Sequence, residues 1–157
     1  MVVMDQFTRR IIGFAVHGGT LDGVTLCCLF NKIISNKNLP IYLSSDHDPL
    51  FNYQRWHANL RVLDIEEIKS VPYAPMSHPF IERVIGTIRR ELLDQTFFWN
   101  QSDLQAKLTQ FMSYYNDDRC HWSLDGKTPK EIATDDVIKS ININDHQWKK
   151  YCNGLCQ

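Results

Sequence analysis

The sequence predicts a mixed α/β fold, and three observations carry this prediction. Two β-rich runs open the chain, a short apolar strand follows at residues 41–45, and two apolar stripes of helical period come later. Alternation with a period of two favours strands, whereas apolar residues at i, i+3, i+4 and i+7 favour helices. With 157 residues, 43% of them hydrophobic, the chain is long enough to bury one core.

The predicted elements follow the order β-β-α-β-α-β-α-α. The first two strands suit an antiparallel hairpin, because only the polar pair Thr8 and Arg9 separates them. The predicted strands span residues 1–7, 10–17, 41–45 and 65–71. The predicted helices span residues 21–34, 49–63, 81–92 and 104–115.

Capping residues and prolines place the helix ends. Asp48 is the expected cap of the second helix, with Pro49 as its first residue. Ser102 or Asp103 is expected to cap the fourth helix, and the polar run over residues 116–118 is expected to stop it. The third helix has the clearest periodicity, and its apolar stripe consists of Ile81, Val84, Ile85, Ile88 and Leu92.

Charge and hydropathy exclude several classes of protein. The formal net charge is −1, which excludes the strongly basic surface of an avid non-specific DNA binder, so any nucleic-acid surface must be local. The longest apolar stretch, residues 24–30, is far shorter than the ~20 residues that cross a bilayer. No membrane association is expected. The opening residues lack the features of a signal peptide, so a cytoplasmic location is expected.

The five cysteines do not form a regular framework. Cys27 and Cys28 are adjacent in an apolar segment and are interpreted as buried small hydrophobic residues. A zinc site built from Cys120, His121 and the two cysteines near the C-terminus lacks the usual paired spacing. Metal binding there is disfavoured.

Two carboxylates lie at positions that suit metal-dependent phosphoryl transfer. Asp46 follows a predicted strand, and Glu82 lies in the first turn of the clearest helix, with 35 residues between them. Mg²⁺ prefers oxygen ligands, and carboxylates can hold the ions that stabilise attacking and leaving oxygens. The structural alternative is that Asp46 caps a turn and Glu82 complements the helix dipole.

Arginines on the same helix as Glu82 extend this candidate site into a polar strip. Arg89 follows Glu82 by seven residues, which places it about 20° away around the helix, with Gly86 between them. Arg83 and Arg90 lie at the edge of this strip. Arginine can bind a DNA phosphate with two hydrogen bonds. The structural alternative, which is the commoner one, is that these arginines lie on a solvent-exposed helix face without a ligand.

Three segments together resemble the catalytic core of DDE integrases and insertion-sequence transposases, the retroviral integrase-like family. They are SSDHDPLF, PYAPMSHPFIERVIGTIRREL and YYNDDRCHWSLDGKTPKEIA, and the resemblance runs from Met1 to about Ala133. It implies a ribonuclease H-like mixed sheet flanked by helices. It also implies that Asp46 and Glu82 are the second and third acids of a site that binds Mg²⁺ or Mn²⁺, and the 35-residue interval is the family's own.

The resemblance leaves the first acid of the family without a match. The segment MDQFTRRIIGF matches a later part of the family pattern, so Asp5 corresponds to an aspartate that does not bind metal. We therefore expect an N-terminally truncated core that lacks the first strand and its carboxylate. Whether Asp5 substitutes for that carboxylate stays open. A neighbouring copy is expected to be able to pair along the open sheet edge.

Two functions from different classes follow. The first is DNA integration or transposition, in which Asp46 and Glu82 hold the metal while Arg83, Arg89 and Arg90 bind the DNA backbone. The second is a catalytically inactive transposase remnant that folds and binds DNA or a partner transposase. A nuclease of the same fold acting on RNA–DNA hybrids has no specific motif in its favour.

The expected partners are DNA and either further copies of the chain, as a dimer or larger oligomer, or a full-length transposase. The expected domains are a catalytic core over residues 1–134 and a C-terminal tail over residues 135–157.

Overall fold

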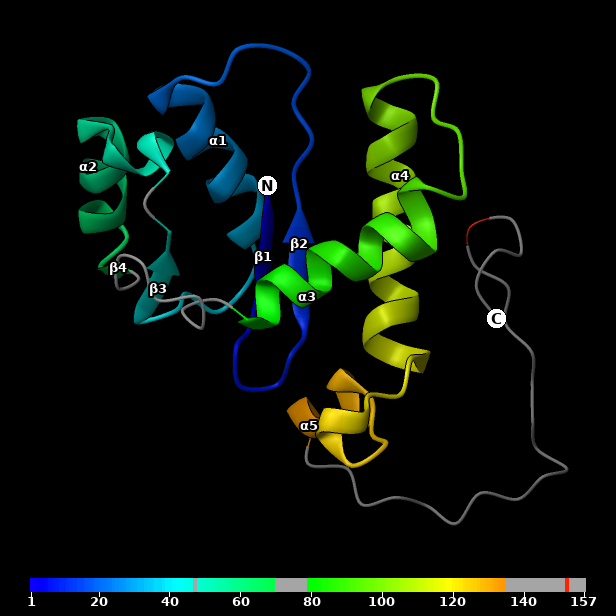
Figure 1. The fold of residues 1–157 in the computed structure, drawn as a ribbon. Helices are drawn as coiled ribbons and strands as arrows, with labels where there is room; N and C mark the ends of the chain where they lie inside the picture. Colours follow the sequence, from blue (N-terminus) through cyan, green and yellow to red (C-terminus); the bar gives the residue numbers. More distant parts are fainter. Residues whose placement is uncertain (47, 70–78, 135–151, 153–157) are drawn as a thin grey trace, which may run out of the picture.

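The computed structural model describes residues 1–46, 48–69, 79–134 and 152, and Figure 1 shows their arrangement. The strands are β1 (Val2–Met4), β2 (Ile11–Phe14), β3 (Tyr42–Ser45) and β4 (Glu66–Lys69). The helices are α1 (Gly23–Ile34), α2 (Gln54–Val62), α3 (Pro79–Ile88), α4 (Gln101–Ser113) and α5 (Pro129–Thr134). The predicted mixed α/β class is confirmed.

The described strands form two separate two-stranded sheets. β1 pairs antiparallel with β2, as the hairpin prediction requires, whereas β3 pairs in parallel with β4. The connection between β3 and β4 contains α2, because parallel neighbours need a crossover rather than a tight turn. The hairpin contains an irregularity at which Ile12 is left without a register partner, since Val3 pairs with Gly13 and Met4 pairs with Ile11.

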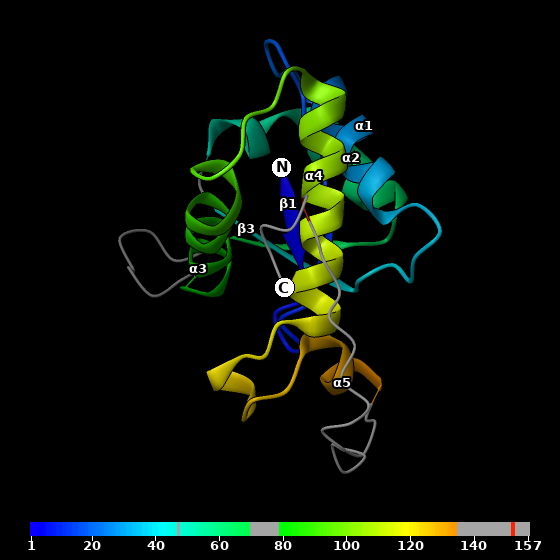
Figure 2. The same ribbon diagram turned by 90° about the vertical axis from the view of Figure 1, so that its right-hand side faces the viewer.

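Helices cover both faces of the hairpin, as Figure 2 shows with β1 between α3 and α1. One core cluster joins the hairpin to α3 and α4, and its members include Ile88, Leu92 and Phe111. The other cluster joins the opposite face to α1 and α2, around Phe30 and Trp56. The alternation of side chains along the strands divides the hairpin between the two clusters.

Gly13 permits the close approach of β2 to α1. A Cβ at this position would lie 2.9 Å from Cγ2 of Ile33, which is closer than ordinary van der Waals contact. Gly13 is also buried. The glycine therefore sets the distance between the hairpin and α1.

Two helix starts and one whole helix differ from the sequence-based expectations. Pro49 and Asp48 begin a 3₁₀ turn, η1 (Pro49–Asn52), and not α2 itself, because Tyr53 adopts an extended backbone between the two. Asn100 caps α4 by accepting a 2.9 Å hydrogen bond from the amide of Asp103, so the cap lies just before the two residues expected there. The short helix α5 was not expected, because six residues are too few to show a periodic stripe.

Both long helices of the second half end in a π-helical turn. α3 continues into η2 (Arg89–Leu93), and α4 continues into η3 (Tyr114–Asp118). The extra residue in each turn shifts the angular phase of the helix. The apolar stripe of α3 still reaches Leu92, which is buried as predicted.

The cysteines only partly follow the prediction. Cys28 is exposed and Cys27 is half-buried, so the expectation that both are buried is wrong. Cys152 is 4% exposed and packs into the cluster around Phe111. Apart from Cys152, the predicted tail over residues 135–157 lies outside the described residues.

No helix among the described residues is long and apolar enough to cross a membrane.

Candidate functional site

Asp46 lies immediately after β3, at the carboxyl end of the strand as expected. Its side chain is exposed, and its Oδ1 accepts a 3.0 Å hydrogen bond from the amide of Asp48. Asp48 in turn accepts from the amide of Leu50 at 2.9 Å and so caps η1. The turn that follows β3 therefore orients Asp46 through one carboxylate oxygen.

The neighbouring strand anchors this end of β3. The carboxylate of Glu67 accepts hydrogen bonds from Ser45 Oγ at 2.6 Å and Trp56 Nε1 at 2.9 Å, and it forms an ion pair with Lys69 at 3.1 Å. Burial by itself raises the pKa of Glu67, but the donors around the carboxylate outweigh it, so this pKa lies below its ordinary value. Glu67 thus fixes Ser45, the residue that precedes Asp46.

Glu82 lies in the first turn of α3, and its side chain is exposed. No ion pair joins Glu82 to a basic side chain among the described residues. The position at the positive end of the helix also suits the structural alternative, in which Glu82 complements the dipole. Asp46 and Glu82 come from separate elements, and no hydrogen bond within the described part of the chain joins them.

The three predicted DNA-binding arginines, Arg83, Arg89 and Arg90, are all exposed. Arg90 extends back along the helix, and its Nη1 would lie 3.2 Å from a Cβ at Gly86. Gly86 is therefore covered by a guanidinium group, whereas Arg89 is open to solvent on η2. Arg83 lies close enough to Arg9 and Tyr115 to affect the pKa of both groups.

Arg9 is a cationic residue of this surface that the sequence analysis did not identify. It sits in the hairpin turn with a φ of 63°, in the left-handed region. Its guanidinium carbon lies 3.2 Å from the centroid of the Phe80 ring at the start of α3, which is a cation–π contact. Burial, and then the neighbouring Arg83, lower the pKa of Arg9. The only sequence signal was its place in a polar turn.

Asp5 organises the same turn. Its carboxylate accepts a 2.6 Å hydrogen bond from Thr8 Oγ1, a 3.0 Å bond from the amide of Phe7 and a longer bond from the amide of Thr8. These contacts give the carboxylate a structural role in the hairpin. The expectation that Asp5 corresponds to an aspartate outside the metal site stays a prediction.

A bidentate ion pair holds the π-helical end of α3 in place. Arg119 donates to Glu91 on η2 through Nη2 at 2.7 Å and through Nε at 3.2 Å. Burial opposes the charge of Arg119, but the Glu91 carboxylate outweighs it and raises the pKa of Arg119. His121 packs edge-on against Tyr115 at 4.6 Å between ring centroids, and burial together with Arg119 lowers the pKa of His121. The segment after α4 thereby fixes the helix that carries Glu82.

The donor chemistry of Asp46 and Glu82 fits a magnesium ion. Both are exposed carboxylates, and magnesium in proteins is commonly bound by one or two carboxylates together with water and substrate phosphates. Among the described residues, no group of three or more His, Cys, Asp or Glu side chains is placed to hold a metal ion.

Comparison with known proteins places these features in a family context. Residues 63–129 match the family described as "Integrase core domain". The chain is 24% identical over 133 residues to the transposase for insertion sequence element IS904 of Lactococcus lactis subsp. lactis (strain IL1403), covering 83% of this chain and 53% of that protein. The chain spans about half the length of the curated relatives it matches.

The fold matches solved integrase structures. The catalytic core of BIV integrase superimposes with a TM-score of 0.65 at 19% identity, covering 85% of this chain and 84% of that one. The HTLV-2 integrase catalytic core, solved in complex with magnesium in a dimeric form, gives a TM-score of 0.58 at 16% identity, covering 83% of this chain and 80% of that one. The chain therefore has the mixed α/β fold of the retroviral integrase catalytic core, and its residues 63–129 match the integrase core domain family.

Proposed function

We propose that this chain acts in DNA transposition or integration, as a metal-dependent core that cleaves and transfers DNA strands. The observation that carries the proposal is the combination of the integrase core fold with Asp46 at the end of β3 and Glu82 in the first turn of α3. The similarity to an insertion-sequence transposase supports DNA as the substrate.

In this proposal Asp46 and Glu82 hold Mg²⁺ or Mn²⁺. Bound metal supplies an activated water or 3′-hydroxyl nucleophile and neutralises charge on the phosphodiester. Asp46 is held ready by its Asp48 amide contact, which leaves its second oxygen for a ligand. Glu82 projects from a helix whose far end is fixed by the Glu91–Arg119 ion pair.

The arginines bind and orient the DNA backbone. Arg83, Arg89 and Arg90 are exposed on α3 and η2, and Arg9 adds a further charge beside Arg83. These exposed arginines form a local cationic group, which is compatible with DNA binding by a chain whose net charge is −1. The proposed assembly contains more than one copy of the chain or a full-length transposase, and the dimeric HTLV-2 core supports it.

The test of catalysis is cleavage and strand joining on a labelled DNA duplex with Mn²⁺ or Mg²⁺. Asp46→Asn and Glu82→Gln are expected to abolish the activity while far-UV circular dichroism shows intact folding. Glu66→Gln is the matched control, since Glu66 is an exposed carboxylate at the opposite end of the β3–β4 pair, and it is expected to keep full activity. Equal activity in all variants would refute the metal-binding assignment.

The same variants separate the enzyme from an inactive DNA-binding protein. If the folded chain binds DNA but no variant or wild type cleaves it, the function is binding without catalysis. For the DNA contacts, Arg89→Gln is expected to weaken binding and to reduce the slope of log K against log salt by about one. Arg61→Gln on α2, the control, is expected to leave the slope unchanged. An unchanged slope in Arg89→Gln would remove that residue from the DNA surface.

A further inference from the structure

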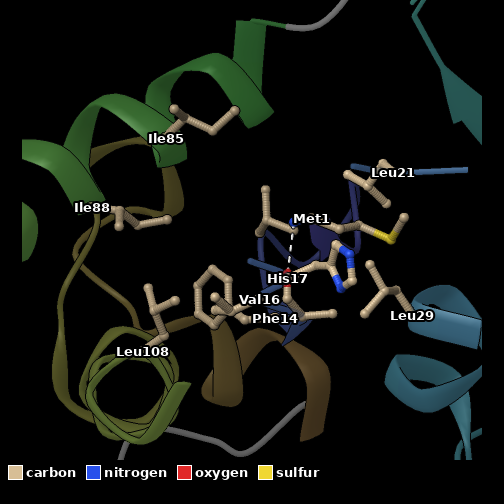
Figure 3. A pocket seen from close by; sticks show the side chains of 11 residues that line it. Met1, Phe14, Val16, His17, Leu21, Leu29, Ile85, Ile88 and Leu108 are labelled. Atoms are coloured by element: carbon tan, nitrogen blue, oxygen red, sulfur yellow. Dashed lines mark hydrogen bonds between the residues drawn. The ribbon is translucent and has the colours of Figure 1, made fainter. Parts of the chain in front are cut away.

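The first turn of α3, which carries Glu82, lies outside the hydrophobic core. Among the described residues, neither core cluster includes any of residues 79–82. Farther along the helix, Ile88 packs into the cluster that contains Leu108 of α4 and Phe14 of β2 (Figure 3). The position of Glu82 therefore depends on contacts that the first turn makes outside these clusters.

Arg9 supplies such a contact from the hairpin turn. Its guanidinium carbon lies 3.2 Å from the centroid of the ring of Phe80, which comes two residues before Glu82. A guanidinium group over a ring face is attracted to the ring, and the attraction grows as water is removed, as it is in part around the half-buried Arg9. Figure 1 shows α3 beginning beside the turn that joins β1 to β2. The contact thus ties the first turn of α3 to the hairpin.

The hairpin turn fixes the position of this guanidinium group. The amide of Asp5 donates to the carbonyl of Arg10 at 2.8 Å, and this bond closes the turn. The carboxylate of Asp5 accepts a 2.6 Å hydrogen bond from Thr8 Oγ1. Within the same turn, Nη1 of Arg9 donates to the carbonyl of Gln6. The guanidinium group is therefore held by a closed turn on one side and by the aromatic ring on the other.

The backbone of Arg9 is an independent observation. Its φ of 63° lies in the left-handed region, which glycine adopts freely and other residues adopt at a cost. A turn that needed only this backbone conformation would accept glycine without strain. Strain that is kept at a residue with a specific side-chain contact indicates that the side chain has a role beyond closing the turn.

We propose that Arg9 is a positioning residue, which acts through Phe80 to hold the first turn of α3 and so places the carboxylate of Glu82 for a divalent metal ion. This inference rests on the proposed function, because it takes Glu82 as a metal ligand. It gives Arg9 a role that differs from DNA binding, since the guanidinium group acts here on the protein itself.

The first test measures opening of the helix end by hydrogen exchange. In an α-helix the amide of residue 84 pairs with the carbonyl of residue 80, so exchange at Val84 reports the turn that contains Phe80. In Arg9→Gln, exchange at Val84 is expected to be about threefold faster or more, whereas exchange at Leu26 of α1 stays unchanged. Arg10→Gln is the matched control, because Arg10 is an exposed cation of the same turn and makes no cation–π contact among the described residues. It is expected to leave exchange at Val84 unchanged.

A glycine variant separates the contact from the turn. Arg9→Gly relieves the left-handed backbone and removes the guanidinium group. Exchange of the Asp5 amide, which closes the turn, is expected to stay the same or to slow, while exchange at Val84 becomes faster. Slower or unchanged exchange at Val84 in this variant would show that Arg9 serves the turn alone and would overturn the proposal.

A double-variant cycle tests whether Arg9 and Phe80 act together. Phe80→Leu keeps an apolar side chain but removes the ring, so it is expected to speed exchange at Val84 as much as Arg9→Gln does. The combined variant should show no further increase, because either change removes the same contact. Arg9→Lys keeps a cation for the ring and is expected to restore part of the protection. Effects that add in full would contradict the proposed coupling.

Mn²⁺ binding connects the helix end to the metal, and the electron paramagnetic resonance signal of the free ion measures it. Arg9→Gln is expected to weaken Mn²⁺ binding about threefold, with partial rescue in Arg9→Lys and no change in Arg10→Gln. Glu82→Gln is expected to weaken it more strongly. Unchanged binding in Glu82→Gln would reject the proposed metal function and the positioning role with it. Weaker binding in Glu82→Gln but unchanged binding in Arg9→Gln would reject the positioning role alone.

Discussion

Asn116 connects the end of α4 to the hairpin, and its replacement by alanine tests how much this connection stabilises the fold. Its Nδ2 donates to the carbonyl of Ile11, and its Oδ1 accepts from the amide of Ile11, both at 2.9 Å. The two residues are 105 positions apart in sequence. Ile11 is 1% exposed and Asn116 is 5% exposed, so water does not replace these bonds easily.

The expected loss follows from two buried backbone groups left without partners. Each such group costs about 1–3 kcal/mol, and partial relaxation reduces the sum, so Asn116→Ala should lower the free energy of unfolding by about 2–4 kcal/mol. The measurement is urea unfolding at pH 7, with the midpoint and m-value fitted together.

The chain offers a control with the same chemistry on its surface. Asn59 and Asn31 exchange two amide hydrogen bonds, at 2.9 and 3.0 Å, in an exposed position between α2 and α1. Water satisfies these groups when one partner is lost, so Asn59→Ala should cost less than about 1 kcal/mol. Equal losses in the two variants would refute the argument that burial, and not the number of hydrogen bonds, sets the cost.

Three further predictions concern single contacts. The pKa of Glu67 is depressed in the folded chain, so its ionised form stabilises the fold at pH values above the ordinary pKa of 4.5. This stabilisation is lost as the pH falls through the folded-state pKa. The difference in unfolding free energy between wild type and Glu67→Gln, measured by urea titration, should therefore shrink at acid pH. Gly13→Ala should lower the free energy of unfolding by about 1–3 kcal/mol, because the added Cβ would clash with Ile33. An unchanged free energy in thermal or urea unfolding would show that α1 can shift to make room for the methyl group. Arg119→Lys should lower the free energy of unfolding by about 1 kcal/mol, because lysine cannot form the bidentate ion pair with Glu91. An unchanged urea midpoint would show that this ion pair does not stabilise the fold.

The periodic parts of the fold were predictable from sequence. The stripe containing Val84 and Ile88 predicted α3, and the β-rich run ending before Asp46 predicted β3, because each depends on a local pattern of burial. The position of Asp46 after a strand and of Glu82 in a first turn also followed from these local patterns. Their assignment as metal ligands stays a prediction.

The remaining features depend on contacts between distant residues. Ile12 is left out of the ladder at an irregularity of the hairpin, and no local pattern in the sequence predicts that position. Arg9 joins the arginines of α3 only because the turn folds over Phe80. The π-helical turns likewise accompany a tertiary contact, the ion pair between Glu91 and Arg119.

The buried Cys152 thiol allows local opening of the core to be measured by chemical labelling. Its amide donates to Gln110 and its thiol to the carbonyl of Lys107, so α4 shields the sulfur from solvent. Cys28 and Cys120 are exposed and should react with an alkylating reagent at once. Cys152 should react only when its contacts with α4 open, and the ratio of the rates would measure how often that happens. Alkylation followed by mass spectrometry would therefore report the local opening of this core without any engineered label.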